Sequence, residues 1–116
     1  MKVLVCGSRS WSDYDAIHAA LAQLVEERGS FSVMHGAARG ADRLGGAAAR
    51  RLGLEVIEYP ADWKRYGRRA GYLRNEQMLA AGPDLVVAFH EGASRGTAHT
   101  IALARKAGIE VLVLER

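Results

Sequence analysis

The chain has 116 residues, of which 49% are hydrophobic and 25% are charged, as is usual for a folded globular protein. This length fits a single domain over residues 1–116 and excludes two independent cores. The formal net charge of +3 suits an anionic ligand, but it does not by itself indicate binding to nucleic acid.

The sequence lacks the marks of a secreted or membrane protein. Its longest apolar runs, such as Leu85–Phe89, are far shorter than the ~20 residues needed to cross a bilayer. Residues 1–7 show neither the apolar core nor the cleavage site of a signal peptide. Cys6 is the only cysteine, which excludes an internal disulfide, and its place at the end of an apolar strand indicates an inert buried thiol. We therefore expect a cytoplasmic protein with no membrane contact.

The first half of the chain alternates apolar strands with helices. Residues 1–6 form a short apolar segment that predicts a strand. Ser12 and Asp13 then provide the start of a helix, apolar residues recur at helical spacing, and Gly29 ends the helix. Residues 31–35 are the second predicted strand, and the Ala-rich segment 41–52 is the second predicted helix.

The second half continues the alternation. It is predicted to contain a strand (54–59), a loop (61–69) and a helix (70–81). A strand (84–89), a helix (97–107) and a last strand (109–114) follow. Apolar strands that alternate with helices indicate an α/β fold with a mostly parallel sheet. We expect a single doubly wound, five-stranded, Rossmann-like sheet in the order 3-2-1-4-5, with helices on both faces.

The loops after the strands hold most of the unusual residues. In a doubly wound sheet, ligands bind beyond the carboxyl ends of the strands, where the strand order reverses. Glycines, hydroxyls, arginines and aspartates follow the first four strands, and we predict that these residues bind a ligand: Gly7, Ser8, Arg9; Gly36, Arg39, Gly40, Asp42; Asp62, Trp63; and Ser94, Arg95, Gly96, Thr97.

The segment Ser94–Thr97 opens a helix. Free backbone N–H groups and the helix dipole favour an anion there, and Arg95 could add a bidentate contact. The alternative is an ordinary Ser/Thr cap followed by a turn glycine. The loop Gly7–Arg9 is similar, but it does not match the G-x-G-x-x-G fingerprint of NAD-binding proteins.

Asp42 and His35 each have a structural and a functional interpretation. Asp42 lies in the first turn of a predicted helix, where the dipole stabilises a carboxylate. It could instead accept hydrogen bonds from ligand hydroxyls or orient Arg39. His35, at a strand end, is more often structural than a general acid or base. The four histidines lack the spacing of metal ligands, so we expect neither a metal nor a cofactor.

The segment 62–75 mixes basic and aromatic residues. Such a mixture can stack bases and bind phosphates, but a solvated basic loop is the favoured interpretation of its first half. Arg74, Asn75 and Met78 share one helical face. We predict that Arg74 and Asn75 point toward the same edge of the sheet and bind the ligand.

Five ordered segments together resemble the YspA-like branch of the SLOG superfamily, which is named after the SMF/DprA and LOG proteins: Val5–Trp11, His35–Asp42, Pro60–Trp63, Ala70–Asn75 and Ser94–Thr97. The resemblance covers nearly the whole chain. It implies a Rossmann-like protein of bacterial or phage origin that binds nucleotides or nucleotide-derived signals. It also implies a homo-oligomer, a dimer or larger.

The LOG enzymes of this superfamily cleave the N-glycosidic bond of nucleoside 5′-monophosphates, and their signatures look like P-G-G-x-G-T-x-x-E and R-K-x-x-M. Arg74 and Met78 match the second signature, and Gly96-Thr97 matches part of the first, but Thr100 stands in place of its Glu. Glycosidic cleavage needs a carboxylate, so this replacement favours binding over hydrolysis. The carboxylates that could substitute for it are Asp42, Asp62 and Glu91.

Three functions stay open at this point. The favoured one is a sensor or binding module for a nucleotide-derived small molecule, such as an ADP-ribose-like or mononucleotide species. The second is a phosphoribohydrolase, with Arg74 on the phosphate or ribose and Asp42 or Asp62 as the catalytic acid or base. The third, and least favoured, is DprA-like binding of single-stranded DNA through residues 63–74.

Overall fold

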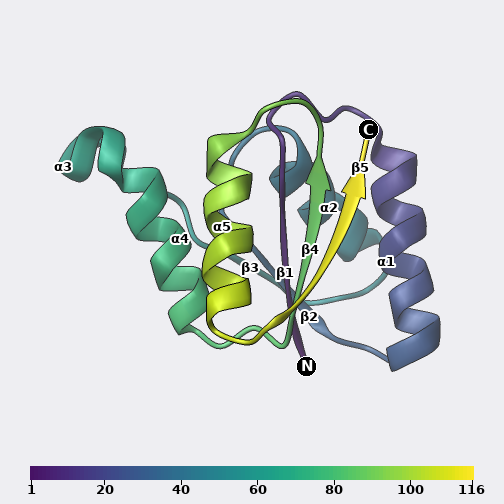
Figure 1. Cartoon of the computed structure of the whole chain (residues 1–116). Coiled ribbons are helices and arrows are strands. Elements are labelled where there is room, and N and C mark those ends of the chain that lie inside the picture. The colour runs from purple at the N-terminus through teal and green to yellow at the C-terminus, as the bar shows by residue number, and fades with distance from the viewer.

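The computed structural model describes residues 1–116 and contains one five-stranded parallel sheet in the order β3-β2-β1-β4-β5 (Figure 1). The strands are β1 (Lys2–Gly7), β2 (Ser32–His35), β3 (Val56–Glu58), β4 (Leu85–His90) and β5 (Glu110–Glu115). The predicted fold class and strand order are confirmed. In the register of the central strands, Val3 of β1 pairs with Val33 of β2 on one side and with Leu85 of β4 on the other.

Helices cover both faces of the sheet. Two of them, α1 (Tyr14–Arg28) and α2 (Ala41–Arg51), lie on one face, and α4 (Ala70–Ala80) and α5 (Arg95–Lys106) lie on the other (Figure 1). The short helix α3 (Trp63–Tyr66) and the 3₁₀ turn η1 (Gly67–Arg69) precede α4, and α3 lies away from the sheet. No helix is long and apolar enough to cross a membrane.

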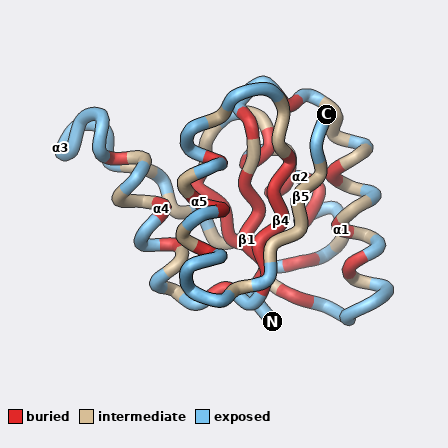
Figure 2. The backbone as a smooth tube through the Cα atoms, in the orientation of Figure 1, coloured by how far each residue is buried: buried red, intermediate tan, exposed pale blue.

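Successive side chains of a strand point to opposite faces of the sheet, and helices cover both faces, so the central strands are buried on both sides. Val3 and Val5 of β1 pack in the larger core with α1 and α2, whereas Leu4 and Cys6 pack in a smaller core with α4 and α5. Figure 2 shows β1 and β4 as the most buried part of the chain and α3 as exposed. The fixed sheet therefore holds the loops after β1 and β4 next to each other.

Residues 61–69 were expected to form a loop, and that prediction is wrong, because most of this segment is helical. The Asp62 carboxylate accepts a hydrogen bond from the Arg65 N–H (3.2 Å) and caps α3, which ends at Gly67. No residue of α3 is buried, so the segment has no apolar periodicity to reveal it.

Two other boundaries also differ from the prediction. Helix α5 begins at Arg95 rather than at residue 97, because Ser94 caps it. Strand β3 is limited to Val56–Glu58 instead of 54–59, since the Leu54 N–H bonds back to the Ala49 carbonyl (2.9 Å) at the end of α2.

Candidate functional site

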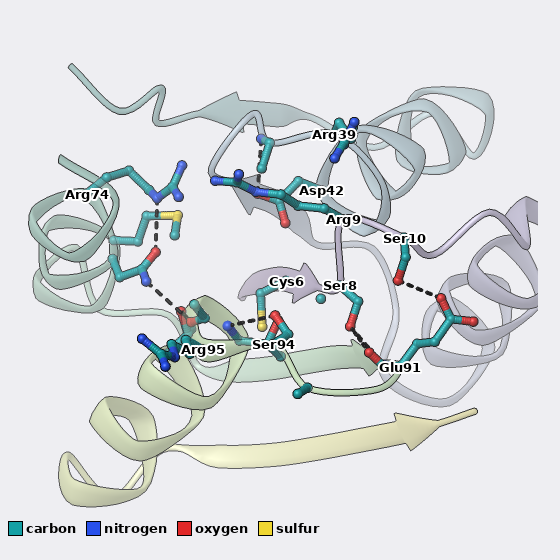
Figure 3. Close-up of a pocket in the computed structure, with 18 residues that line it drawn as sticks. Cys6, Ser8, Arg9, Ser10, Arg39, Asp42, Arg74, Glu91, Ser94 and Arg95 are labelled. Atoms are coloured by element: carbon teal, nitrogen blue, oxygen red, sulfur yellow. Dashed lines mark hydrogen bonds between the residues drawn. The ribbon is translucent and has the colours of Figure 1, made fainter. Parts of the chain in front are cut away.

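A cavity of about 650 Å³ opens beyond the carboxyl ends of β1 and β4, where the strand order reverses (Figure 3). It has the size of a typical small-molecule site. We call it the main cavity. Its walls contain most of the predicted ligand-binding residues: Gly7, Ser8, Arg9, Arg39, Asp42, Arg74, Asn75, Ser94, Arg95, Gly96 and Thr97.

Ser8 joins the loops after β1 and β4. Its buried hydroxyl donates to the Glu91 carbonyl and accepts from the Glu91 N–H, both at 2.8 Å. Ser10 donates to the Glu91 carboxylate at 2.7 Å. Figure 3 shows these three residues together at one end of the main cavity. Ser8 thus holds together the two loops that line the cavity, and its hydroxyl hydrogen is already used in this contact.

Asp42 organises the loop between β2 and α2. Its side chain is almost fully buried, and one carboxylate oxygen accepts from the N–H groups of Gly36 (3.1 Å) and Ala38 (3.3 Å). Burial raises the pKa of Asp42 to about 6, although these two hydrogen bonds and the Arg74 charge oppose the increase. Asp42 makes no hydrogen bond to the exposed Arg39, so the orienting role considered for it is not seen.

Replacing Asp42 with asparagine should change the pH dependence of stability. The folded carboxyl has its pKa raised from 3.8 to about 6, so the folded chain holds this proton more tightly than the unfolded chain does. The stability contributed by this group therefore falls as the pH rises from about 4 to about 6. We expect Asp42→Asn to gain about 2 kcal/mol relative to the wild type between pH 4 and pH 7.

Urea unfolding of both proteins across this pH range measures the difference. The amide oxygen can keep both backbone hydrogen bonds, and Asp15→Asn on the exposed part of α1 is the matched control. A difference between Asp42→Asn and wild type that stays constant with pH would contradict the raised pKa.

Arg74 and Asn75 connect α4 to the loop after β2 and to the start of α5. The Arg74 Nε–H donates to the Asn75 amide oxygen (2.9 Å), and its Nη1 donates to the Gly36 carbonyl. Asn75 in turn donates to the Gly96 carbonyl (3.4 Å) and lies 3.2 Å from the His99 Nδ1. Burial lowers the pKa of Arg74, although Asp42 opposes this effect. Of the five guanidinium N–H groups, three stay available to a ligand.

Gly36 must be glycine for Arg74 to take this position. A Cβ at Gly36 would overlap the Arg74 guanidinium. Gly40 is equally constrained, since its φ is +79° and a Cβ there would lie 2.5 Å from the carbonyl oxygens of Ser8 and Arg9. Gly40 lines no described cavity, so its part in the site is to allow two loops to approach each other.

The start of α5 forms one wall of the main cavity. The Ser94 hydroxyl accepts from the Thr97 N–H (3.4 Å) and lies 2.7 Å from the Thr97 hydroxyl, so Ser94 is an ordinary cap. The first backbone bond across the start of the helix runs from Ala98 to the Ser94 carbonyl (3.0 Å), which leaves the N–H groups of Arg95 and Gly96 free. Both interpretations of this segment are therefore compatible with the geometry.

Three other predicted residues lie outside the main cavity, namely Gly36, Asp62 and Trp63. Asp62 is exposed, caps α3 and lines neither described cavity. Trp63 lines a second cavity of about 430 Å³, together with Gly36. Of the three catalytic candidates, the structure brings Asp42 and Arg74 together and leaves Asp62 apart.

The ligand-binding prediction omitted several residues of the main cavity, among them Ser10, Ala38, Glu91 and Thr100. Glu91 was considered only as a substitute catalytic carboxylate, although its position in the loop after the fourth strand was a usable signal. Thr100 lies one turn into α5, and its hydroxyl donates to the Gly96 carbonyl (3.1 Å). Its alignment with the Glu of the LOG signature was a sequence signal for this position in the cavity.

Cys6 and His35 fit the structural roles expected for them. Burial raises the pKa of the Cys6 thiol well above its usual range, which keeps the sulfur neutral. His35 is 1% exposed, and its Nδ1 accepts from the Ala37 N–H at 2.9 Å. Burial lowers the pKa of His35, so the imidazole is neutral near pH 7.

Comparisons with known proteins agree with this architecture. Residues 1–66 match the model of the YspA, cpYpsA-related SLOG family. The chain belongs to this family. The Gene 61 protein of Mycobacterium phage D29 is 42% identical over 117 residues, which cover 96% of this chain and 94% of that protein.

Two solved structures share the fold at low sequence identity. MurG from Acinetobacter baumannii has a TM-score of 0.60 at 13% identity, over 98% of this chain and 34% of MurG. DNA processing protein A (DprA) from Streptococcus pneumoniae has a TM-score of 0.57 at 17% identity, over 96% of this chain and 58% of DprA. This chain thus spans about a third of MurG and little more than half of DprA. At the general level, membership of a SLOG family supports a module for a nucleotide-related ligand.

Proposed function

We propose that this protein binds a phosphate-bearing, nucleotide-derived small molecule in the main cavity and acts as a sensor or binding module. The observation that carries this proposal is the charge of the cavity wall. Four arginines line it, namely Arg9, Arg39, Arg74 and Arg95. The wall has only two carboxylates, and each is already bonded, Asp42 to backbone N–H groups and Glu91 to Ser10.

An anionic ligand fits this wall better than a neutral one does. Arginine side chains bind phosphate oxygens bidentately, and the start of α5 adds free N–H groups. Hydroxyls from Ser10 and Thr100 lie in the same wall and can bond a ribose. The site therefore offers donors for phosphate together with groups for a sugar.

A panel of nucleotides tests the proposal by thermal shift. AMP, CMP, ADP-ribose, NAD and cyclic nucleotides are the probes, and a ligand at ~100 times its Kd should add about 2.7 kcal/mol of stability. Chromatography of each stabilising compound then shows whether it is intact. Stabilisation without turnover supports the sensor, and a panel in which no phosphorylated compound stabilises the protein refutes it.

Arg95→Ala is expected to weaken binding of the stabilising nucleotide about 10-fold, because an exposed arginine at the cavity wall makes one charge-assisted contact. Arg105→Ala is the matched control, since Arg105 is exposed on the same helix but lies at its far end. Titration calorimetry of the two variants measures the difference. Equal affinities for both would show that the start of α5 does not hold the anion.

A phosphoribohydrolase is the second candidate, and Asp42 is the observation that favours it. This carboxyl lies in the main cavity, and its pKa of about 6 is suited to proton transfer near neutral pH. Release of free base from AMP or CMP, lost in Asp42→Asn, would establish the enzyme. The two bonds from Gly36 and Ala38 already occupy one of its oxygens, so binding without cleavage is the better supported function.

A further inference from the structure

A second cavity of about 430 Å³ adjoins the main one, and Arg9, Ala38, Arg39 and Arg74 line both. Its other lining residues come from two chain segments, Gly36, Ala37 and Arg43 after β2 and Pro60, Ala61 and Trp63 after β3. We call it the Trp63 cavity. The shared wall makes the two cavities halves of one site.

The chemistry of the Trp63 cavity differs from that of the main one. Four arginines line it, but no carboxylate and no hydroxyl does. It therefore suits a group that combines negative charge or acceptor atoms with a flat apolar surface. The main cavity, in contrast, has hydroxyls and the free N–H groups of α5.

Trp63 presents an exposed aromatic surface at this cavity. Its side chain is 49% exposed, although it is one of the largest apolar groups in the chain. Gly71 of α4 lies against the ring edge, where a Cβ would be 3.3 Å from Cη2. The Arg9 guanidinium lies 5.9 Å from the ring centroid, near the outer limit of a cation–π contact. One edge of the indole thus lies against α4, and about half of the side chain stays exposed.

The backbone of Ala37, another residue that lines the Trp63 cavity, is also unusual. Ala37 has a φ of +58°, and it is the only residue other than glycine with a positive φ. Such a conformation costs free energy and persists only where neighbouring contacts hold it. Here the His35 Nδ1 accepts from the Ala37 N–H (2.9 Å), and the Arg43 Nε–H donates to its carbonyl (3.2 Å). The Ala37 part of the cavity lining is therefore held by two hydrogen bonds.

We propose that the Trp63 cavity is a nucleobase subsite and that Trp63 is the surface on which the base stacks. This inference rests on the proposed function. It assigns the ligand to the class of nucleoside diphosphates, free or extended by a sugar. The base lies on Trp63, the phosphoryl groups lie along the arginines shared by the two cavities, and the far end of the ligand lies in the main cavity.

The test compares probes with and without a base on the intact chain. Ribose 5-phosphate and pyrophosphate lack a base, AMP has a base and one phosphate, and ADP and ADP-ribose have a base and two. We expect Trp63→Ala to weaken the binding of ADP and ADP-ribose about 10- to 100-fold in titration calorimetry, because stacking on an aromatic residue contributes about this much affinity per base. The affinity for pyrophosphate should stay within about twofold, and Trp63→Phe should restore most of the loss.

Tyr66→Ala is the matched control, since Tyr66 is another exposed aromatic residue of α3 that lines neither cavity. Its affinity for ADP should equal that of the wild type. Binding of ADP should also quench tryptophan fluorescence, and Trp63→Phe should abolish the quenching because Trp11 is buried in the core.

The outcomes separate this inference from the proposed function. If no phosphorylated probe binds the wild type, the proposed function fails and the base subsite fails with it. If pyrophosphate and ADP bind equally well, or if Trp63→Ala weakens every probe to the same extent, the phosphate site stands and the base subsite is refuted. If AMP binds as tightly as ADP and ADP-ribose, the diphosphate class is refuted.

Discussion

Arg74→Ala is expected to weaken binding of the stabilising nucleotide about 1000-fold, the largest effect of any change in the site. Arg74 is the half-buried arginine that lines both cavities, whereas Arg9, Arg39 and Arg95 are exposed. Two charge-assisted hydrogen bonds to a phosphoryl group contribute about 4 kcal/mol together, which corresponds to this loss in affinity. Titration calorimetry with ADP or ADP-ribose measures it.

Two companion variants make the Arg74 result specific. Arg74→Lys keeps the charge but loses the planar fork that reaches both Gly36 and Asn75. Its nucleotide affinity should therefore lie between that of Arg74→Ala and that of the wild type. Arg51→Ala removes an exposed arginine at the end of α2 that lines neither cavity, and it should bind as the wild type does. An affinity for Arg74→Ala within tenfold of that of Arg51→Ala would place the phosphate elsewhere.

Gly40→Ala is expected to destabilise the fold by about 4 kcal/mol. The residue has φ +79° and ψ −130°, a backbone conformation that is essentially limited to glycine and costs other residues of order 1–3 kcal/mol. The new Cβ would also lie 2.5 Å from the carbonyl oxygens of Ser8 and Arg9, and relieving that overlap costs a further ~1–3 kcal/mol. Urea unfolding monitored by circular dichroism measures the loss.

Gly29→Ala separates the two causes. Gly29 has a similar backbone conformation, φ +81° and ψ −173°, but no atom lies within 4 Å of the position that a Cβ would take. Its loss should be about 2 kcal/mol, the cost of the backbone conformation alone. Equal losses at Gly40 and Gly29 would mean that the close approach of the loops after β1 and β2 contributes nothing to stability.

The difference between these two glycines illustrates the limit of the sequence. Both lie next to predicted helices: Gly29 was expected to end the first, and Gly40 directly precedes the second. The amino-acid pattern shows that a glycine permits an unusual backbone conformation, but it does not show which other segment approaches it. That second fact depends on contacts between residues far apart in the chain, such as Gly40 and Ser8.

The candidate site shows the same division. The topological rule placed the loops after β1, β2 and β4 at one edge, so the position of Arg9, Asp42 and Arg95 beside one cavity could be predicted from the sequence. The role of Asp42 in holding the Gly36 and Ala38 N–H groups was not predictable, because it depends on the path of the loop. Asp62 was assigned to the site because it follows a strand, but a local cap holds it outside the cavity.

The sequence by itself determined the class of fold, the strand order and the edge of the sheet that carries the polar loops. It could do so because alternating periodicity and right-handed crossovers are properties of local chain segments. Only the tertiary structure decided that Arg74 lines two cavities, that the Ser8 hydroxyl bonds to the Glu91 backbone, and that Trp63 and the positive-φ residue Ala37 line the same cavity. These relations join side chains from different elements, and they exist only after the sheet has brought the loops together.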